Sequence, residues 1–404
     1  PTPIPCVADT ANLEGDMQSR PRVPASRIAF LSSNDHWGGS EELWSRTAIH
    51  LARTGVEVSA YKRNFVQAPG PADELEGAGC RVVDLQPMSG TSRTARRARA
   101  FIRPLDRHLH DFRITHDFKQ RPPDLAVISQ GLNYDGWQLA AICQRRGVPY
   151  VLISQKASDL YWPPDNCRDG FQAAYRHALA ALFVSEHNRV LTEEQLGFRL
   201  TNGKVVRNPF NADRMTPAPW PDTDGGYHLV CLARLDAREK GQDLLVRVLA
   251  MPKWRKRDLR VSLYGAGQNE RGLVEMATML GLDSVAFAGF AAAPAEIWRN
   301  AHGLILPSRC EGLPLSLIEA MLHGRIAVVT DAGGNREAVA DGVTGFIAEA
   351  ATEASLDAAL ERAWSQRTKW REMGADAATL ARTLVDQDPV EAMAGLVLDL
   401  AATG

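Results

Sequence analysis

Cysteine is scarce in this sequence, and its spacing offers neither a disulfide framework nor a zinc site. The six cysteines, at positions 6, 80, 143, 167, 231 and 310, form no CxxC pair and no His/Cys cluster with metal-ligand spacing. Disulfide scaffolds and structural zinc sites depend on such spacings. The pattern fits reduced thiols, so we expect a cytoplasmic protein.

Long apolar runs and an excess of one charge are also lacking. The longest apolar stretches, such as Leu229–Leu232, have the length of strands and fall far short of the roughly 20 residues that span a membrane. The chain has 46 Lys and Arg against 48 Asp and Glu, a formal net charge of -2. We therefore expect no nucleic-acid partner, and any membrane contact must be peripheral.

The length and rhythm of the chain predict two α/β domains. Its 404 residues exceed the roughly 250 to 300 at which one hydrophobic core stops growing. Residues 1–25 are rich in Pro and polar residues without periodicity, and we expect a disordered leader there. From Arg27 on, short β-rich runs alternate with helical patterns. Such alternation predicts βαβ units and parallel sheets that are buried on both faces.

The predicted elements fall into two series on either side of a linker dense in Pro and Asp at 216–226. The first has strands at 28–32, 56–61, 81–85, 125–129, 150–154 and 182–185, helices at 41–53 and 92–110, and a glycine-rich turn after 56–61. The second has strands at 228–234, 259–264, 285–289, 303–307 and 326–330, then helices at 352–367, 369–382 and 388–402. We expect two Rossmann-like, doubly wound domains at 26–208 and 209–387, and a helix at 388–404 that could return to the first domain.

The strongest chemical signal runs from Cys310 to Met321, directly after a predicted strand. Pro314 suits the first turn of a helix and Gly324 suits its stop. The start of this helix offers free N–H groups and a positive dipole end, which together make an anion site. Glu311 precedes the helix and Glu319 lies about one turn inside it. The two carboxylates could contact different parts of one elongated ligand, or they are a loop acid and a solvated helix residue.

Two cations and a pair of glycines give further signals. Arg234 lies at the carboxyl end of a predicted strand and Lys240 opens the next helix. A guanidinium fork with an ammonium suits a pyrophosphate. The alternative is a pair of surface cations. Gly38 and Gly39 follow the first strand, where they allow close backbone approach to a ligand or simply form a tight turn.

Several patterns invite assignments that we do not make. Asp222-Thr223-Asp224 has the DxD spacing of a metal site, but it lies in the linker and is interpreted as a turn. Gly265-Ala266-Gly267 lacks the third glycine of a dinucleotide-binding loop. We assign no role to His187 or His302.

The C-terminal half resembles the retaining GT-B glycosyltransferases of family 4, the glycosyl transferases group 1. The match spans roughly residues 229–347, and its features occur in the expected order. They are Arg234 with Lys240-Gly241, Gly265-Ala266-Gly267, Ala288-Gly289-Phe290, Glu311 through Glu319 with Ala320-Met321, Gly333-Gly334 with Glu337, and Asp341-Gly342 with Gly345-Phe346. The resemblance implies a GT-B fold, in which an N-terminal acceptor domain faces a C-terminal donor domain across a cleft.

The resemblance also implies residue roles. Arg234 and Lys240 would hold the donor diphosphate, Glu311 would contact sugar hydroxyls, and Glu319 would bind the ribose. Further donor contacts would come from Gly38, Gly39, Gly265, Gly289, Phe290, Gly312, Leu313 and Leu315. Such enzymes use no metal and no cofactor, and they retain the anomeric configuration. The donor would be a UDP-, GDP- or ADP-sugar, and the acceptor a glycan, a lipid-linked molecule or a small molecule.

One family feature is missing from the loop after the strand at 150–154. Many members place a histidine there, near the transferred sugar, whereas this chain has Gln155 and Lys156. We expect Gln155 to act in its place as a catalytic residue, and Lys156 could hold an anionic acceptor or the donor phosphate. His36, Lys156 and Asp159 are the acceptor-side candidates. Alternatively, the polar loop residues only satisfy backbone groups.

Residues 91–121 contain nine Lys and Arg residues with apolar residues between them. This segment could contact anionic lipid on the cytoplasmic face of a membrane or an anionic acceptor, or it is a solvated helix face.

Three functions remain open from the sequence. The first is a hexosyltransferase of glycan or glycoconjugate biosynthesis. The second is a GT-B-like isomerase or phosphorylase, although no lysine stands out as a pyridoxal carrier. The third is a non-catalytic scaffold that binds nucleotide sugars. Because Arg234, Lys240, Glu311 and Glu319 are all present, the sequence favours the transferase.

Overall fold

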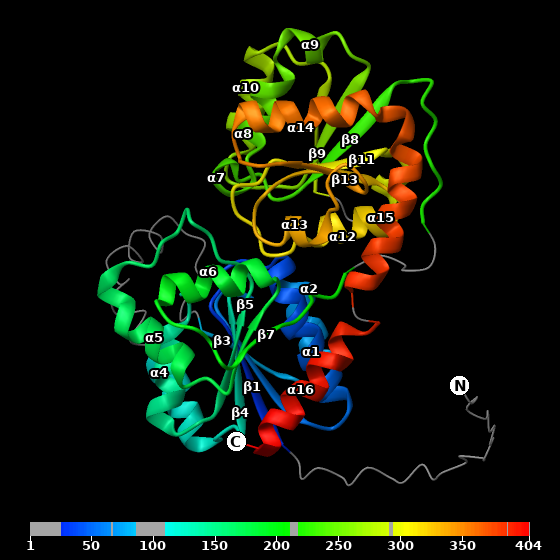
Figure 1. Ribbon diagram of the computed structural model, residues 1–404. Helices are drawn as coiled ribbons and strands as arrows, with labels where there is room; N and C mark the ends of the chain where they lie inside the picture. Colours follow the sequence, from blue (N-terminus) through cyan, green and yellow to red (C-terminus); the bar gives the residue numbers. More distant parts are fainter. Residues whose placement is uncertain are drawn as a thin grey trace, which may run out of the picture.

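The computed structural model describes residues 26–65, 68–85, 110–210, 217–290, 294–385 and 387–403. Two α/β halves follow each other along the chain, each built on its own sheet (Figure 1). This confirms the predicted fold of two Rossmann-like domains. The predicted leader at 1–25 and the part of the basic segment up to residue 109 lie outside the described residues. The exact domain boundaries stay a prediction.

The N-terminal half contains a seven-stranded parallel sheet with the strand order β3-β2-β1-β4-β5-β6-β7. Its strands are β1 (Arg27–Ser32), β2 (Glu57–Lys62), β3 (Arg81–Asp84), β4 (Leu125–Gln130), β5 (Tyr150–Ser154), β6 (Ala180–Phe183) and β7 (Gly203–Val205). Its helices are α1 (Glu42–Arg53), α2 (Pro69–Gly77), α4 (Trp137–Arg146), α5 (Arg168–Arg176) and α6 (Glu186–Leu196), with short 3-10 turns at Gly39–Glu41 and Asp165–Cys167.

Helices cover both faces of this sheet because successive strand residues point to opposite sides. In β1, Ile28 and Phe30 belong to a core cluster with residues of α1. Ala29 and Leu31 belong to a second cluster with residues of α4 and α5. Since both faces are buried, residues 28–31 of the strand are all apolar instead of alternating with polar residues, as the sequence predicts for a parallel sheet.

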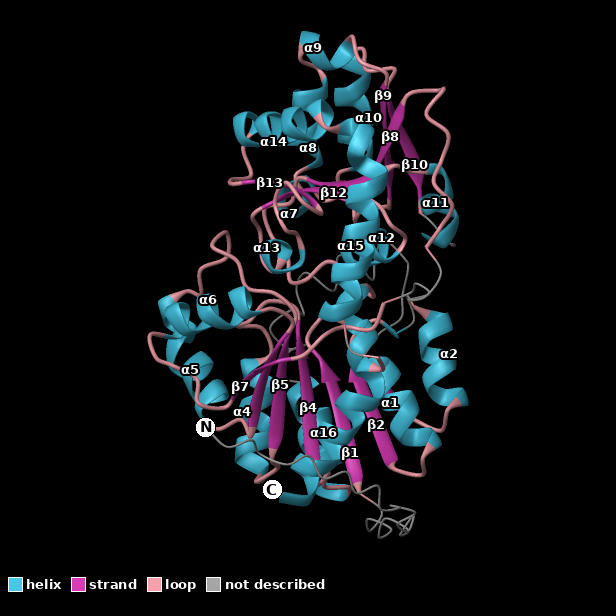
Figure 2. Ribbon diagram, turned by 45° about the vertical axis from the view of Figure 1, so that its right-hand side comes forward, coloured by secondary structure: helices cyan, strands magenta, loops and turns pink. Residues whose placement is uncertain are grey.

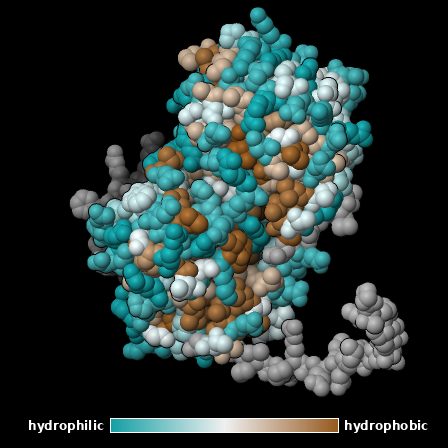
Figure 3. Space-filling view, viewed as in Figure 1, coloured by the Kyte–Doolittle hydropathy of each residue, from teal (hydrophilic) through white to brown (hydrophobic). Residues whose placement is uncertain are grey.

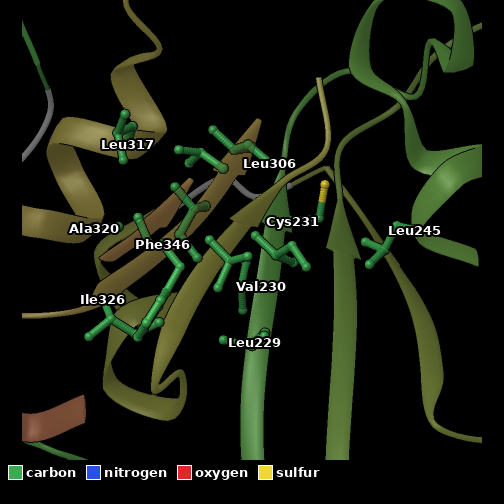
Figure 4. Packing of buried hydrophobic residues seen from close by; sticks show 14 of the residues in the cluster. Leu229, Val230, Cys231, Leu245, Leu306, Leu317, Ala320, Ile326 and Phe346 are labelled. Atoms are coloured by element: carbon green, nitrogen blue, oxygen red, sulfur yellow. The ribbon is translucent and has the colours of Figure 1, made fainter. Parts of the chain in front are cut away.

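The C-terminal half contains a six-stranded parallel sheet with the order β10-β9-β8-β11-β12-β13. Its strands are β8 (Tyr227–Leu232), β9 (Leu259–Tyr264), β10 (Val285–Gly289), β11 (Gly303–Leu306), β12 (Ile326–Thr330) and β13 (Gly345–Ala348). Its helices are α7 (Ala237–Lys240), α8 (Gln242–Leu249), α9 (Pro252–Arg255), α10 (Glu270–Met279), α11 (Pro294–Asn300), α12 (Leu315–Leu322), α13 (Asn335–Ala338), α14 (Glu353–Ser365) and α15 (Trp370–Leu384). Figure 4 shows Val230, Leu306 and Phe346 in its core.

The strand order reverses once in each sheet. In the first sheet the reversal lies between β1 and β4, and in the second between β8 and β11. At such a point the two following connections turn to opposite faces of the sheet, and ligands bind outside the carboxyl ends of the strands there. The fold therefore singles out four loops, those that follow β1, β4, β8 and β11.

The last helix, α16 (Pro389–Thr403), returns to the N-terminal half. It packs against α1 (Figure 2). Its Met393, Ala394 and Val397 are buried in the same cluster as Phe30. By contrast, α15 belongs to the C-terminal core, where it packs against α12. The chain therefore passes between the halves twice, once between β7 and β8 and once between α15 and α16.

Most predicted elements are present, and the differences have local reasons. The glycine-rich turn expected after β2 is wrong, because α2 forms there with Pro69 in its first turn, where a missing N–H costs nothing. β6 begins two residues before its predicted start, and Ser185 caps α6 by accepting from the Asn188 N–H at 3.2 Å. β7 and β13 were not predicted, since each has only three or four residues.

The surface mixes polar and apolar side chains. On the face in Figure 3, hydrophobic residues form separate groups among hydrophilic ones. Within the described ranges, no helix combines the length and the apolar character needed to cross a bilayer.

His302 has a structural role beside β8, the first strand of the C-terminal half. The ring is 2% exposed and lies 5.4 Å from the ring of Trp220 and 5.2 Å from that of Tyr227, between centroids. Its Nδ1 accepts from the His228 N–H at 2.9 Å. Burial lowers the pKa of His302 to about 4.

This histidine makes the stability of the fold sensitive to mild acid. In the unfolded chain His302 binds a proton near pH 6.5, but the folded protein binds it only near pH 4, so stability falls as the pH falls through that window. Between pH 7 and pH 5, the wild type should lose about 2 kcal/mol more unfolding free energy than His302→Asn. Urea titrations at both pH values measure this difference. An equal loss in the two proteins would contradict it.

Candidate functional site

The loops at the carboxyl ends of the two sheets meet between the halves. The backbone of Gly312, after β11, approaches the Gln155 carbonyl so closely that a Cβ on Gly312 would lie 2.0 Å from that oxygen. A Cβ on Gly39 would lie 3.1 Å from Leu315 Cδ1. The His187 N–H also donates to Glu337 Oε1 at 2.8 Å. The predicted glycine loop and the predicted anion site are therefore neighbours.

Lys240 and Glu311 form an ion pair at the point where the second sheet reverses its order. Lys240 does not open a helix as predicted: it ends α7 after β8, and α8 begins only at Gln242, because Gly241 between them has a left-handed φ of 65°. Glu311 lies in the loop after β11, and Lys240 Nζ is 2.7 Å from Glu311 Oε2. Ser308 Oγ donates to the other carboxylate oxygen at 2.7 Å. The Glu311 carboxylate is therefore fixed from two sides, and the residue is only 5% exposed.

Arg234 and Lys156 share a second carboxylate, that of Glu239. Arg234 Nη2 donates to Glu239 Oε2 at 2.7 Å, and Lys156 Nζ lies 2.8 Å from both of its oxygens. Burial raises the pKa of Glu239, but the charges of Lys156 and Arg234 outweigh this and hold it below its usual range. Glu239 is thus ionised at neutral pH. Lys156 belongs to the N-terminal half, so this cluster bridges the two halves.

Helix α12 begins at this junction. Pro314 occupies the N-cap position, one residue before its predicted place in the first turn, and Gly324 follows the helix with a φ of 74°. Gly312 and Leu313 lead directly into the helix, and Leu315 is its first residue. Glu319 lies one turn inside and is 4% exposed. The predicted order of carboxylate, helix N-terminus and carboxylate is therefore present.

The remaining donor-side predictions lie at the ends of β9 and β10. The Gly265 N–H donates to the Gly289 carbonyl at 2.8 Å. A side chain on Gly265 would collide with the Ala233 carbonyl, since its Cβ would lie 2.0 Å away. Phe290 is 81% exposed at the same edge. An exposed ring beside bare backbone can lie against a flat ligand such as a base.

Gln155 is buried in the junction. Its Oε1 accepts from Asn208 Nδ2 at 2.8 Å, and the residue is 5% exposed. Its Nε2 is buried and has no hydrogen-bond partner among the described residues. A buried amide donor without a partner costs free energy, so the position is suited to a ligand that brings an acceptor.

A buried ion pair holds the glycine loop in place. Glu41 and Lys62 are both fully buried and lie 3.1 Å apart, between Oε2 and Nζ. Ser32, Asn34 and Trp44 also donate to the Glu41 carboxylate, at 2.7 to 3.0 Å. Lys62 Nζ donates to the carbonyls of Asn34 and His36 in the loop. Burial lowers the pKa of Lys62, and Glu41 opposes this shift.

A pocket of about 320 Å³ lies at the order reversal of the first sheet. Its lining residues include Tyr134, Trp137, Arg63 and Asp135. Asp135 Oδ2 accepts from the Leu132 N–H at 2.8 Å, and burial raises the pKa of this carboxyl group. The cavity therefore offers flat apolar surfaces together with charged hydrogen-bonding groups.

The three predicted acceptor-side residues lie elsewhere. His36, Lys156 and Asp159 are not among the residues that line this pocket. The side chains of His36 and Asp159 are exposed. Whether any of the three contacts an acceptor stays a prediction.

The DxD pattern forms a turn, in which the Asp224 N–H donates to Asp222 Oδ1 at 3.0 Å. In the part of the chain that the structure describes, no three His, Cys, Asp or Glu side chains are grouped so as to hold a metal ion.

Sequence reasoning gave no role to several of the residues that organise this site. Glu239 stands between Arg238 and Lys240 in a run of charges, a pattern typical of a solvated surface. Lys62 ends β2, and its buried partner Glu41 lies 21 positions earlier. Neither charge stands out in the sequence, because Lys62 is followed by Arg63 and Glu41 by Glu42.

Two family models match most of the chain. The model for glycosyl transferases group 1 matches residues 226–366, and that for the glycosyl transferase 4-like domain matches residues 38–209. Among curated proteins, the D-inositol 3-phosphate glycosyltransferase of Gordonia bronchialis is 30% identical over 402 residues, which cover 92% of this chain and 86% of that protein. Matches to three further relatives span only 42%, 28% and 39% of those proteins' lengths.

Solved structures show the same fold. Anabaena Alr3699/HepE, solved in complex with UDP, has a TM-score of 0.70 and 19% identity, and the match covers 94% of this chain and 100% of that one. Sucrose-phosphate synthase from Thermosynechococcus elongatus has a TM-score of 0.72 and 18% identity, with the same coverage.

The buried ion pair beneath the glycine loop gives a prediction for stability. Lys62→Met should lower the unfolding free energy by about 3 to 5 kcal/mol, because it leaves the Glu41 carboxylate buried without a counter-charge. The double variant Lys62→Met/Glu41→Gln removes both charges and should recover most of the loss. Urea unfolding of the three proteins measures the effect. If the double variant is no more stable than Lys62→Met, the unpaired Glu41 charge is not the cause of the lost unfolding free energy.

Proposed function

The chain belongs to the glycosyl transferases group 1, family 4 of the GT-B glycosyltransferases, and from this premise we propose that it transfers a hexosyl unit from a nucleoside diphosphate sugar to an acceptor hydroxyl. We further propose that the anomeric configuration is retained, that no metal ion takes part, and that the reaction belongs to glycan or glycoconjugate biosynthesis.

One observation carries this proposal: Lys240 and Glu311 meet at the β8/β11 reversal, beside the start of α12. A nucleoside diphosphate needs cations and N–H donors for its phosphates, and a helix N-terminus with a neighbouring lysine supplies both. Glu319 lies one turn away for the ribose hydroxyls, and Phe290 is exposed for the base. The ligand would therefore extend along the carboxyl edge of the second sheet.

The same residues explain how the reaction could proceed without a metal. The bond from the sugar C1 to the β-phosphate oxygen breaks, and negative charge grows on the departing diphosphate. Arg234, Lys240 and the N–H groups at the start of α12 are preorganised to stabilise that charge. The released phosphate oxygen takes the proton of the acceptor hydroxyl as the new C1–O bond forms. Because acceptor and leaving group share one face of the sugar, the configuration is kept.

Gln155 fits a role beside the transferred sugar. Its unpartnered Nε2 can donate to a sugar hydroxyl, while Asn208 holds its Oε1. An amide does not titrate near neutral pH. Gln155 can therefore take over the orienting role of the family histidine, but not a role as a titrating group.

The pocket in the first sheet suits a sugar-like acceptor. A sugar has apolar C–H faces for rings such as Tyr134 and Trp137, and hydroxyls for Asp135 and Arg63. The charge of Lys156 at the junction lowers the pKa of Asp135, against the larger effect of burial, which supports an acceptor position near the donor. An acceptor held there would present a hydroxyl towards the donor site.

Nucleotide binding tests the donor assignment. A thermal-shift screen with UDP, GDP, ADP and their sugars should identify one base, since a ligand at a hundred times its Kd adds about 2.7 kcal/mol of stability. UDP is the first to test, because a structural neighbour is complexed with it.

Lys240→Ala should slow turnover by about 100- to 1000-fold, as it removes a charge that stabilises the leaving group. Lys256→Ala, at an exposed site beside α9, is the control. A wild-type rate in Lys240→Ala would refute the assignment.

Metal dependence and stereochemistry are tested together. Turnover should survive EDTA, because side chains and backbone N–H groups supply the positive charge at the phosphates. The product should carry the anomeric configuration of the donor sugar, as read from the anomeric proton coupling by NMR. Strict dependence on magnesium or manganese, or an inverted product, would exclude this mechanism.

A further inference from the structure

One buried carboxylate at the domain junction holds two cations that come from opposite halves of the chain. Lys156, in the loop after β5, places its Nζ 2.8 Å from both oxygens of Glu239. Arg234, in the loop after β8, donates from Nη2 to Glu239 Oε2 at 2.7 Å. The ammonium and the guanidinium therefore lie next to each other on one shared oxygen.

The position of Glu239 is fixed by its backbone. Its carbonyl accepts from the N–H groups of Arg309 at 2.8 Å and Cys310 at 3.1 Å, the two residues before Glu311. Its N–H donates to Asp236 Oδ1 at 3.3 Å. The residue is 8% exposed. The carboxylate that holds the two cations is thus tied to the loop that carries Glu311.

The loop that carries Lys156 is fixed as well. The carbonyl of Gln155, the preceding residue, fits against Gly312 with no room for a Cβ. Further along, the guanidinium of Arg238 lies 4.7 Å from the ring centroid of Tyr161. Packing on both sides therefore places the Lys156 ammonium at α7, where Lys240 also lies.

Both cations have the capacity to bind a ligand without leaving Glu239. An ammonium has three N–H donors and a guanidinium has five. Glu239 takes two hydrogen bonds from Lys156 and one from Arg234. The side chains of Lys156 and Arg234 are 20% and 52% exposed. Glu239 compensates one of the two positive charges. Lys156 and Arg234 therefore lie side by side without strong mutual repulsion when no ligand is bound.

We propose that Lys156 binds the distal phosphate of the donor, and that Glu239 is a positioning residue that holds Lys156 beside Arg234. The inference rests on the proposed function. The nucleoside end of the donor would lie towards Phe290 and Glu319, and the sugar end must face the acceptor half. Lys156 comes from that half, so it meets the phosphate next to the sugar. Recognition of a diphosphate then requires both halves, whereas a monophosphate needs only the C-terminal one.

Affinities for paired nucleotides test this assignment. Calorimetry would compare UDP with UMP, with GDP/GMP and ADP/AMP as the alternative pairs. In Lys156→Met the diphosphate affinity should fall about ten- to a hundredfold, the worth of one charge-assisted hydrogen bond, while the monophosphate affinity stays unchanged. Glu239→Gln should also lower the diphosphate affinity, whereas Lys156→Arg should leave the diphosphate affinity unchanged. Lys204→Met, at an exposed lysine of β7, is the control.

A second variant guards against misfolding. Lys156→Met leaves Glu239 with fewer counter-charges, but Lys156→Met/Glu239→Gln removes both charges and should show the same loss of preference for the diphosphate. An unchanged ratio of diphosphate to monophosphate affinity in that double variant would overturn the inference and leave the proposed function standing. A wild-type protein that binds no nucleoside diphosphate would overturn both.

Discussion

Parallel pairing of the strands that the structure describes is the constraint on which the site depends. Consecutive parallel strands need a crossover connection, so the loops at the carboxyl ends of the strands gather at one edge of each sheet. The order reverses between β1 and β4 and between β8 and β11. In the first sheet, β1 is followed by the loop of Glu41 and β4 by the loop of Asp135. In the second sheet, β8 is followed by Lys240 and β11 by Glu311. Charged groups from distant parts of the sequence therefore meet without any specific attraction that draws them together.

Glycines decide how closely the two edges approach. At Gly312 and Gly39 the backbone of one half meets atoms of the other at distances that leave little or no room for a side chain. Within the second half, a Cβ on Gly241 would lie 2.0 Å from the Pro307 carbonyl. The close approach at Gly312 also sets the spacing at which Lys156, the residue after Gln155, reaches Glu239.

The sequence predicts most of the elements and those features of the candidate site whose signal is local, and the rest has a physical explanation. Strand lengths, the start of α12 and the spacing of Glu311 and Glu319 are local properties, so they could be predicted. α2 was missed because Pro69 and Gly70 are typical of turns, and only the surrounding fold makes them a helix start. Lys62 and Glu239 owe their roles to partners 21 and 83 positions away. Local periodicity does not predict such pairings, because the partners meet only when the chain is folded.

The return of α16 to the N-terminal half limits how the protein can move. A single linker would let the two halves swing in any direction, but here two covalent crossings join them, one before β8 and one after α15. Two connections allow fewer relative rotations of the halves than one would, because a rotation about either connection must also suit the other. Contacts across the junction, such as that of Gly312 with the Gln155 carbonyl, are therefore backed by two covalent connections as well as by their own packing.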